Sequence, residues 1–173
     1  RAYRLRELDR VRVLEVDLAE VQAAKRARLR TVPENVRFAA IDFDRETLDR
    51  AFEGAGLEPD EPAVFIWEGV TQYLKPESVD AVLRTIAARP RGTQLLFTYI
   101  CADAIAEQGY RPEPWHFGIR PSELRQFLGQ RGLVLVEDRG AEEHMASCLK
   151  PLTRELDVSN IERLASAAVE ICD

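Results

Sequence analysis

Three carboxylates stand where apolar segments of this sequence end, and their positions suggest a shared binding role. Asp17 ends the run "RVRVLEVD", Asp42 follows "VRFAAI", and Glu68 ends "AVFIWE". Carboxylates at the ends of strands in nucleotide-binding sheets accept hydrogen bonds from ribose hydroxyls. Asp42 can instead accept from an adenine amino group while Phe43, the next residue, covers the ring. These side chains therefore predict a site for an adenosine-containing ligand.

Each acid also has a structural explanation. Asp17 can cap the helix that follows it, with Glu20 in the capping-box position, and Asp42 can cap the next helix, for which Asp44 is the first choice. Glu68 is harder to explain in this way. It follows three large apolar residues, and an unpaired carboxylate near apolar surface is costly. We therefore expect a ligand or a partner at Glu68.

The elements that must position these acids alternate along the chain. Apolar runs predict strands at 10–17, 35–43, 63–68, 93–100 and 133–140, and helical periodicity predicts helices at 18–30, 44–56, 75–90 and 120–132. The segment 161–169 fits a strand as well as a helix. Such alternation implies an α/β fold with a mostly parallel sheet, helices on both faces and ligands at the carboxyl ends of the strands.

Two helices have clear packing patterns. In 75–90, Pro76 falls in the first turn, and Val79, Val82, Leu83 and Ile86 share one face. In 18–30, Leu18, Val21, Ala24 and Leu29 can share a face, with the basic side chains of Lys25 to Arg30 in solvent.

The bulk composition bounds the class of protein. The chain has 173 residues, 46% hydrophobic and 31% charged, with a net charge of -6. These values favour one globular domain over 1–173 and argue against a nucleic-acid partner, which requires a basic face. No apolar run is long enough for a membrane span. Cys101, Cys148 and Cys172 are odd in number and without CxxC spacing, so we expect no metal site and a cytoplasmic location.

Several segments together resemble the leucine carboxyl methyltransferase-like family of class I S-adenosylmethionine-dependent methyltransferases. They are "RAYRL", "LEVDLAEVQAAKRARL", "VRFAAIDF", "FIWEGVTQYLKPESVDAVLRTIA" and "EPWHFGI". The resemblance implies a Rossmann-like fold and S-adenosyl-L-methionine as cofactor. It also implies that Asp17 binds the ribose, that Asp42 and Phe43 hold the adenine, and that Glu68 lines the methionine end of the pocket.

The sequence departs from this family at its start. In the family, a glycine-rich turn on the first strand precedes the segment that resembles "RAYRL", and upstream helices help to cover the active site. Here the sequence starts at Arg1, so we expect the first strand and the glycine-rich turn to be lacking. Neighbouring strand edges would then be exposed, which makes a homo-oligomer conceivable.

The resemblance implies O-methyl transfer to a small-molecule hydroxyl or carboxylate. A carboxylate needs no general base, whereas a phenol or alcohol does. His116, between Trp115 and Phe117, is in a loop that can face the pocket, although packing is the commoner role for such a residue; no catalytic residue is assigned. Tyr99 and Tyr110 are candidates for substrate contacts, again with packing as the alternative.

Two other interpretations stay open. One is a truncated, catalytically inactive methyltransferase-like fragment or interaction module, supported by the lack of the glycine-rich turn. The other is an NAD-dependent oxidoreductase, which also uses an acid after the second strand. It is less favoured because "IDF" and "WEGVTQYL" fit the methyltransferase pattern and no catalytic Tyr-Lys pair is evident.

Overall fold

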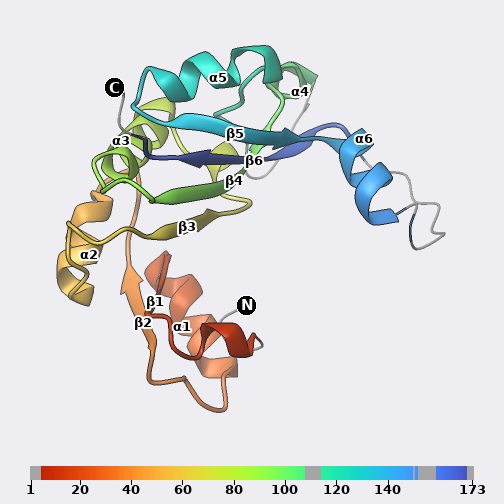
Figure 1. The fold of residues 1–173 in the computed structure, drawn as a ribbon. Helices are drawn as coiled ribbons and strands as arrows, with labels where there is room; N and C mark the ends of the chain where they lie inside the picture. Colours follow the sequence, from red (N-terminus) through yellow and green to blue (C-terminus); the bar gives the residue numbers. More distant parts are fainter. Residues whose placement is uncertain (1–4, 108–113, 150, 152–158, 171–173) are drawn as a thin grey trace. The chain divides into compact units, whose positions relative to one another are not determined.

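The computed structural model describes residues 5–107, 114–149, 151 and 159–170. It divides the chain into two compact units, Arg1–Glu58 and Pro59–Asp173, named here the N-terminal and C-terminal units. Each unit has its own sheet (Figure 1). The two are described separately, and a single domain over 1–173 stays a prediction.

The N-terminal unit is a parallel strand pair with two helices. Its elements are a 3₁₀ turn Arg6–Leu8, β1 Val13–Asp17, α1 Ala19–Arg28, β2 Val36–Ala40 and α2 Leu48–Ala55. Strands β1 and β2 are in register from Val13 opposite Val36 to Asp17 opposite Ala40. The buried apolar side chains of this unit lie on and after β2 and on α2: Val36, Ile41, Leu48, Ala51 and Phe52.

Helix α1 is held to the strands by a polar side chain. Leu18 and Val21, which were predicted to pack inward, are 40% and 43% exposed, so that prediction is wrong. Gln22 is 7% exposed instead. Its Nε2 donates to the carbonyl oxygens of Glu15, at 2.9 Å, and Ala39, at 2.7 Å. One amide group therefore ties α1 to both strands.

The predicted helix caps are also wrong. The N-cap residue of α1 is Leu18 and that of α2 is Thr47, and neither makes a side-chain cap hydrogen bond. Helix α2 begins at Leu48, so Asp44 lies ahead of it. The end of α2 agrees with the prediction, because Gly56 has the left-handed conformation, with φ 66°, that terminates many helices.

The C-terminal unit is built on a four-stranded sheet in the order β3–β4–β6–β5 (Figure 1). Its strands are β3 Val64–Trp67, β4 Gln94–Ile100, β5 Val134–Arg139 and β6 Glu162–Ala168. Its helical segments are the 3₁₀ turn Thr71–Tyr73, α3 Pro76–Ala87, α4 Ala102–Glu107, α5 Pro121–Gly129, α6 Ala141–His144 and a π turn Met145–Leu149.

The tail of the chain forms a strand and not a helix. Strand β6 is antiparallel to both β4 and β5, and it lies between them, with Ala165 opposite Phe97 and Asp138. Strands β3, β4 and β5 consequently run in one direction. The predicted α/β architecture with a mostly parallel sheet is therefore confirmed.

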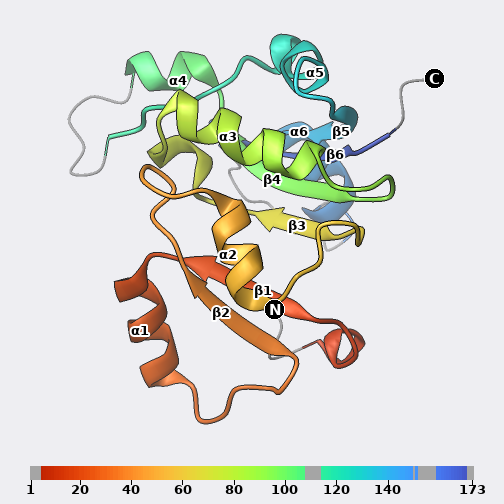
Figure 2. The ribbon, with the colours of Figure 1, turned by 90° about the vertical axis from the view of Figure 1, so that its left-hand side faces the viewer.

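Helices α3 and α5 form the core of this unit with the sheet. Both connect parallel strands and progress in the same direction along the sheet, so right-handed crossovers place them on the same face. Figure 2 shows α3 running along β4. The predicted apolar face of α3 is confirmed, and it shares the core with α5 and the inner strands: Val79, Val82, Leu83, Ile86, Leu95, Phe97, Leu124, Leu128, Ala165 and Ala167 are buried.

The outer strand β3 exposes apolar side chains. Val64 and Ile66 are 63% and 57% exposed, whereas Trp67 is buried. Because side chains alternate along a strand, Val64 and Ile66 face away from the side on which Trp67 packs. Among the described residues, no strand of this unit pairs with the outer edge of β3.

Candidate functional site

Two of the predicted acids meet at one edge of the N-terminal unit. Asp17 is the last residue of β1, and its carbonyl oxygen accepts a 3.0 Å hydrogen bond from the N–H of Ile41. Asp42 follows Ile41 directly, so both acids lie at the carboxyl ends of neighbouring parallel strands. The Asp17 side chain is exposed, and its Oδ1 accepts from the N–H of Leu18 at 2.8 Å.

Asp42 is held by the turn that follows β2. Its Oδ1 accepts from the N–H of Asp44 at 3.0 Å, and its Oδ2 lies 3.3 Å from Nε of Arg45. The carbonyl oxygen of Asp42 also accepts from the N–H groups of Arg45 and Glu46. These bonds make an Asx-type turn, which fixes the carboxylate beside the half-buried Phe43. A ligand at Asp42 would share the carboxylate with Arg45.

Glu68 belongs to the C-terminal unit and directly follows β3. Its side chain is exposed, so no desolvation cost demands a ligand there. The next residue, Gly69, has φ 71°, a left-handed conformation that turns the chain away from the strand. The predicted row of Asp17, Asp42 and Glu68 spans the two units and stays a prediction.

Thr98 on β4 anchors the loop that carries Glu68. Its Oγ1 accepts from the N–H of Gly69 at 2.8 Å, and its carbonyl oxygen accepts from Oγ1 of Thr71 at 2.8 Å. Thr71 and Gln72 are both buried within this turn. The loop that carries Glu68 is thereby attached to β4, an inner strand of the sheet, as well as to β3.

A second segment, residues 114–119, packs against the same turn. The N–H groups of His116 and Phe117 both donate to the carbonyl oxygen of Gln72, at 2.7 and 3.3 Å. Phe117 is buried, with its ring centroid 5.8 Å from that of Phe127, so it is a core residue and not a wall of a substrate pocket. The His116 side chain is exposed, which argues against the packing role that sequence alone favours.

Glycine is required for the close approach of this segment to β4. A Cβ on Gly118 would lie 2.9 Å from the carbonyl oxygen of Ile100 and 3.0 Å from Cα of Ala102. Ile119 continues the contact, because its N–H donates to the same Ile100 oxygen at 3.0 Å. The segment that carries His116 is therefore held by Gln72 on one side and by Ile100 on the other. The His116 side chain itself is exposed.

A buried polar network that sequence reasoning missed joins three strands of the C-terminal unit. Tyr99 is fully buried and its hydroxyl donates to Oδ1 of Asp138 at 3.0 Å. Nε and Nη2 of Arg163 donate to the same carboxylate at 3.1 and 3.0 Å. Tyr99 is thus a packing residue rather than a substrate contact. No local sequence signal marks this network, because its members are far apart in the chain.

The network also shapes the local electrostatics. Burial, followed by the nearby Asp138 carboxylate, raises the pKa of Tyr99 above its usual value. Burial likewise raises the pKa of the Cys101 thiol, whose Sγ donates to the carbonyl oxygen of Asn160. Both groups are therefore neutral near pH 7, and neither is set up as a nucleophile.

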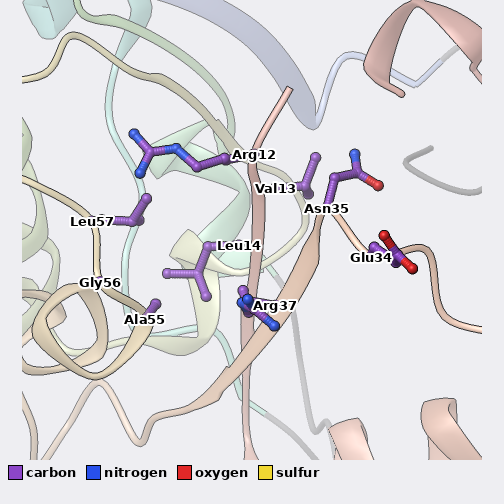
Figure 3. A pocket seen from close by; sticks show the side chains of 9 residues that line it. All are labelled: Arg12, Val13, Leu14, Glu34, Asn35, Arg37, Ala55, Gly56 and Leu57. Atoms are coloured by element: carbon purple, nitrogen blue, oxygen red, sulfur yellow. The ribbon is translucent and has the colours of Figure 1, made fainter. Parts of the chain in front are cut away.

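A hollow in the N-terminal unit lies away from the acids. It has a volume of about 210 Å³ and is lined by Arg12, Val13, Leu14, Glu34, Asn35, Arg37, Ala55, Gly56 and Leu57 (Figure 3). These residues come from the starts of β1 and β2 and the end of α2. Asp17 and Asp42 lie at the opposite ends of the strands, so this hollow is not the predicted site.

No group of three or more His, Cys, Asp or Glu side chains in the described part of the chain is arranged to hold a metal ion. Cys101 and Cys148 are free thiols, whereas Cys172 and Tyr110 lie outside the described residues. No helix in the described ranges is both long and apolar enough to cross a membrane.

Sequence comparison connects the chain to known proteins. Residues 1–87 match the family model described as leucine carboxyl methyltransferase. A Mycolicibacterium gilvum protein is 32% identical over 149 residues, which are 78% of this chain and 48% of that protein. A Mycobacterium tuberculosis H37Rv protein is 34% identical over the same shares of both chains. Both carry the name "Putative S-adenosyl-L-methionine-dependent methyltransferase". The chain spans about half the length of these relatives.

Comparison with solved structures gives the same fold. A Thermobifida fusca protein described as a "putative methyltransferase" aligns with 92% of this chain and 64% of its own, with a TM-score of 0.65 and 19% identity. Human N-acetylserotonin methyltransferase in complex with SAM aligns with 91% of this chain and 40% of its own, with a TM-score of 0.52 and 12% identity. These likenesses support the Rossmann-like fold.

The segments "EVDL" and "IDF", at the carboxyl ends of β1 and β2, both lie within the residues that match the family model. Because that model covers half of the sequence, the chain belongs to the leucine carboxyl methyltransferase family.

Proposed function

We propose that the protein to which this chain belongs is an S-adenosyl-L-methionine-dependent O-methyltransferase that acts on a small-molecule hydroxyl or carboxylate. The observation that carries the proposal is the position of Asp17 and Asp42 at one carboxyl edge of a parallel strand pair, in a chain of this family. The names of the curated relatives and the methyltransferase folds of the structural neighbours support it.

The donor and acceptor chemistry of this edge fits the adenosyl part of the cofactor. The exposed carboxylate of Asp17 would accept from the two ribose hydroxyls. Asp42, fixed in its turn, would accept from the adenine amino group, with Phe43 against the ring. Glu68 carries the charge that an ammonium group requires, which suits the methionine end.

The chain's own residues would act mainly by alignment. When bound, the cofactor supplies a methyl group on a positively charged sulfur, which is already a strong electrophile. Holding donor and acceptor in line can contribute several kcal/mol, since effective molarities of oriented groups are high. The anchoring of the Glu68 loop by Thr98 is the kind of rigid support that alignment needs.

Calorimetric titration with S-adenosylhomocysteine tests the cofactor assignment. We expect Asp17→Ala to weaken binding by roughly 1–3 kcal/mol, because hydrogen bonds to a bound polar group are lost. Glu20→Ala is the matched control, since Glu20 is an exposed acid on the first turn of α1. Unchanged affinity in Asp17→Ala would show that the ribose assignment is wrong, and preferential binding of NAD would favour an oxidoreductase.

A second candidate function is supported by the exposed strand β3. Val64 and Ile66 form an apolar strip on β3, whose outer edge pairs with no other strand in the described part of the C-terminal unit, and such strands are typical of surfaces that pair with another polypeptide. If the wild-type chain binds no S-adenosylhomocysteine but self-associates, an inactive interaction module would be the better description. The predicted absence of nucleic-acid partners and the cytoplasmic location stay predictions.

A further inference from the structure

The carboxyl edge of the C-terminal unit holds groups that cofactor binding does not use. The imidazole of His116 is exposed there, and the neighbouring turn presents the 41% exposed ring of Tyr73. The main-chain bonds of His116 and Phe117 to Gln72 bring the two segments together. We propose that His116 is the proton acceptor for a phenolic methyl acceptor bound at the turn 71–73 and segment 114–118; this inference rests on the proposed function.

The chemistry of imidazole favours a phenol among the possible oxygen acceptors. A carboxylic acid ionises near pH 4 and needs no base at neutral pH. An aliphatic hydroxyl resembles water, whose pKa is about 15.7, so an imidazole base removes its proton less readily. A phenol, with a pKa of about 10, lies within reach of an imidazole base. The ring of Tyr73 and the half-buried Trp115 also offer aromatic surface for an aromatic acceptor.

The main chain at His116 is held in place, as the position of a general base requires. Its own N–H is bonded to Gln72, the next residue is buried, and Gly118 fits against β4 where a Cβ would collide. These constraints fix the main chain while the imidazole stays open to solvent. A proton acceptor requires both properties, because it must reach the substrate hydroxyl and later release its proton.

A buried side-chain oxygen in the same turn lacks a hydrogen-bond donor in the described part of the chain. Gln72 is 6% exposed, and its Oε1 has no hydrogen-bond donor among the described residues. An unpaired buried amide oxygen costs about 1–3 kcal/mol, so a hydrogen-bond donor is expected there. A water molecule enclosed beside the turn would supply it.

The proposed step balances without another reagent. The phenol transfers its proton to an imidazole nitrogen of His116, which becomes imidazolium. With the cofactor bound, the phenolate oxygen would form a bond to the methyl carbon as the bond from that carbon to sulfur breaks, and the electron pair of that bond would stay on sulfur. The products are a neutral methyl ether and a neutral thioether, and the imidazolium returns its proton to water.

Histidine NMR and optical titration test the proposal. The chain has two histidines, so the ring signals of His116 can be followed against those of His144. The probes are 4-nitrophenol and 4-nitrobenzoate, each added with and without S-adenosylhomocysteine. We expect 4-nitrophenol to shift the His116 ring signals and to bind as its coloured anion at a pH where the free phenol is mostly protonated. The benzoate should leave the His116 ring at its free position.

Variants separate proton acceptance from structure. The wild type should bind more 4-nitrophenolate than the pH alone would produce. His116→Gln should lose this additional bound phenolate, and added imidazole should restore part of it. His144→Gln should bind as much phenolate as the wild type. Methyl transfer from S-adenosyl-L-methionine to 4-nitrophenol should fall about 10²-fold or more in His116→Gln, with the loss of the imidazole limb of the pH profile.

The outcomes for this inference and for the proposed function are distinct. If S-adenosylhomocysteine binds but 4-nitrophenol leaves the His116 ring unchanged, or His116→Gln keeps the phenolate, this proposal is overturned and the cofactor assignment stands. If S-adenosylhomocysteine does not bind while 4-nitrophenol still ionises at His116, the proposed function fails and the phenol site stands.

Discussion

The main-chain N–H of His116 lies 2.7 Å from the carbonyl oxygen of Gln72 and donates to it. This bond joins the segment before α5 to the turn after β3, although the two are distant in sequence. Thr98 on β4 anchors that same turn through its hydroxyl and its carbonyl oxygen. The carboxyl edge of the C-terminal unit thus depends on a few hydrogen bonds, which can be tested one at a time.

Thr98→Val removes the acceptor for the N–H of Gly69 and should loosen the loop that carries Glu68. Because Thr98 is buried and the amide would be left unsatisfied, we expect unfolding free energy to fall by about 1–3 kcal/mol in urea titrations. Thr98→Ser retains the hydroxyl and is the matched control. Equal stability of the valine and serine variants would show that this hydrogen bond does not hold the loop.

Tyr99→Phe tests the buried network through its pH dependence. The pKa of Tyr99 is raised in the folded chain, so its stabilising contribution is complete below pH about 10 and is lost as the pH rises further. The wild type should therefore lose unfolding free energy in that alkaline range, whereas Tyr99→Phe should lose less. At neutral pH the variant should be destabilised by about 1.5–3 kcal/mol, the usual value for a hydrogen bond to a charged group.

The control for this experiment is Tyr73→Phe, because the Tyr73 side chain is partly exposed. Its alkaline unfolding profile should match that of the wild type. Parallel profiles for the wild type and Tyr99→Phe above pH 10 would contradict the assignment of the buried hydroxyl as a proton donor to Asp138.

Ile66→Lys tests the exposed strand β3. A charged side chain on a strand edge opposes pairing with another strand, so this variant should self-associate less than the wild type in sedimentation velocity over a range of concentrations. Val136→Lys is the control, because Val136 is also exposed but lies at the register shift in β5, which already disrupts pairing. A wild type that is monomeric at all concentrations would contradict self-association through β3.

Local features of the sequence determined much of the C-terminal unit. The spacing of Val79, Val82, Leu83 and Ile86 predicts the buried face of α3, and Pro76 falls at its start, as expected. The strand predicted at 93–100 differs from β4, Gln94–Ile100, by one residue at its start. These features were predictable because helical periodicity, apolar runs and proline geometry act over a few neighbouring residues.

The position of the acids was predictable in part. Sequence alone placed Asp17 and Asp42 at strand ends, and β1 and β2 put them at one edge because parallel strands end together. It did not reveal that Asp42 shares its carboxylate with Asp44 and Arg45, or that Glu68 is exposed. Those outcomes depend on side-chain rotamers and turn geometry, which the residue pattern leaves undecided.

Only the tertiary structure decided which distant residues meet. It placed β6 between β4 and β5, and so brought Arg163 to Asp138 and Tyr99. It also buried Gln22 in place of Leu18 and Val21, since an amide that bonds two strand carbonyls can replace an apolar contact. Strand order and buried hydrogen bonds arise from contacts between segments far apart in the chain, whereas a single sequence records mainly the preferences of neighbouring residues.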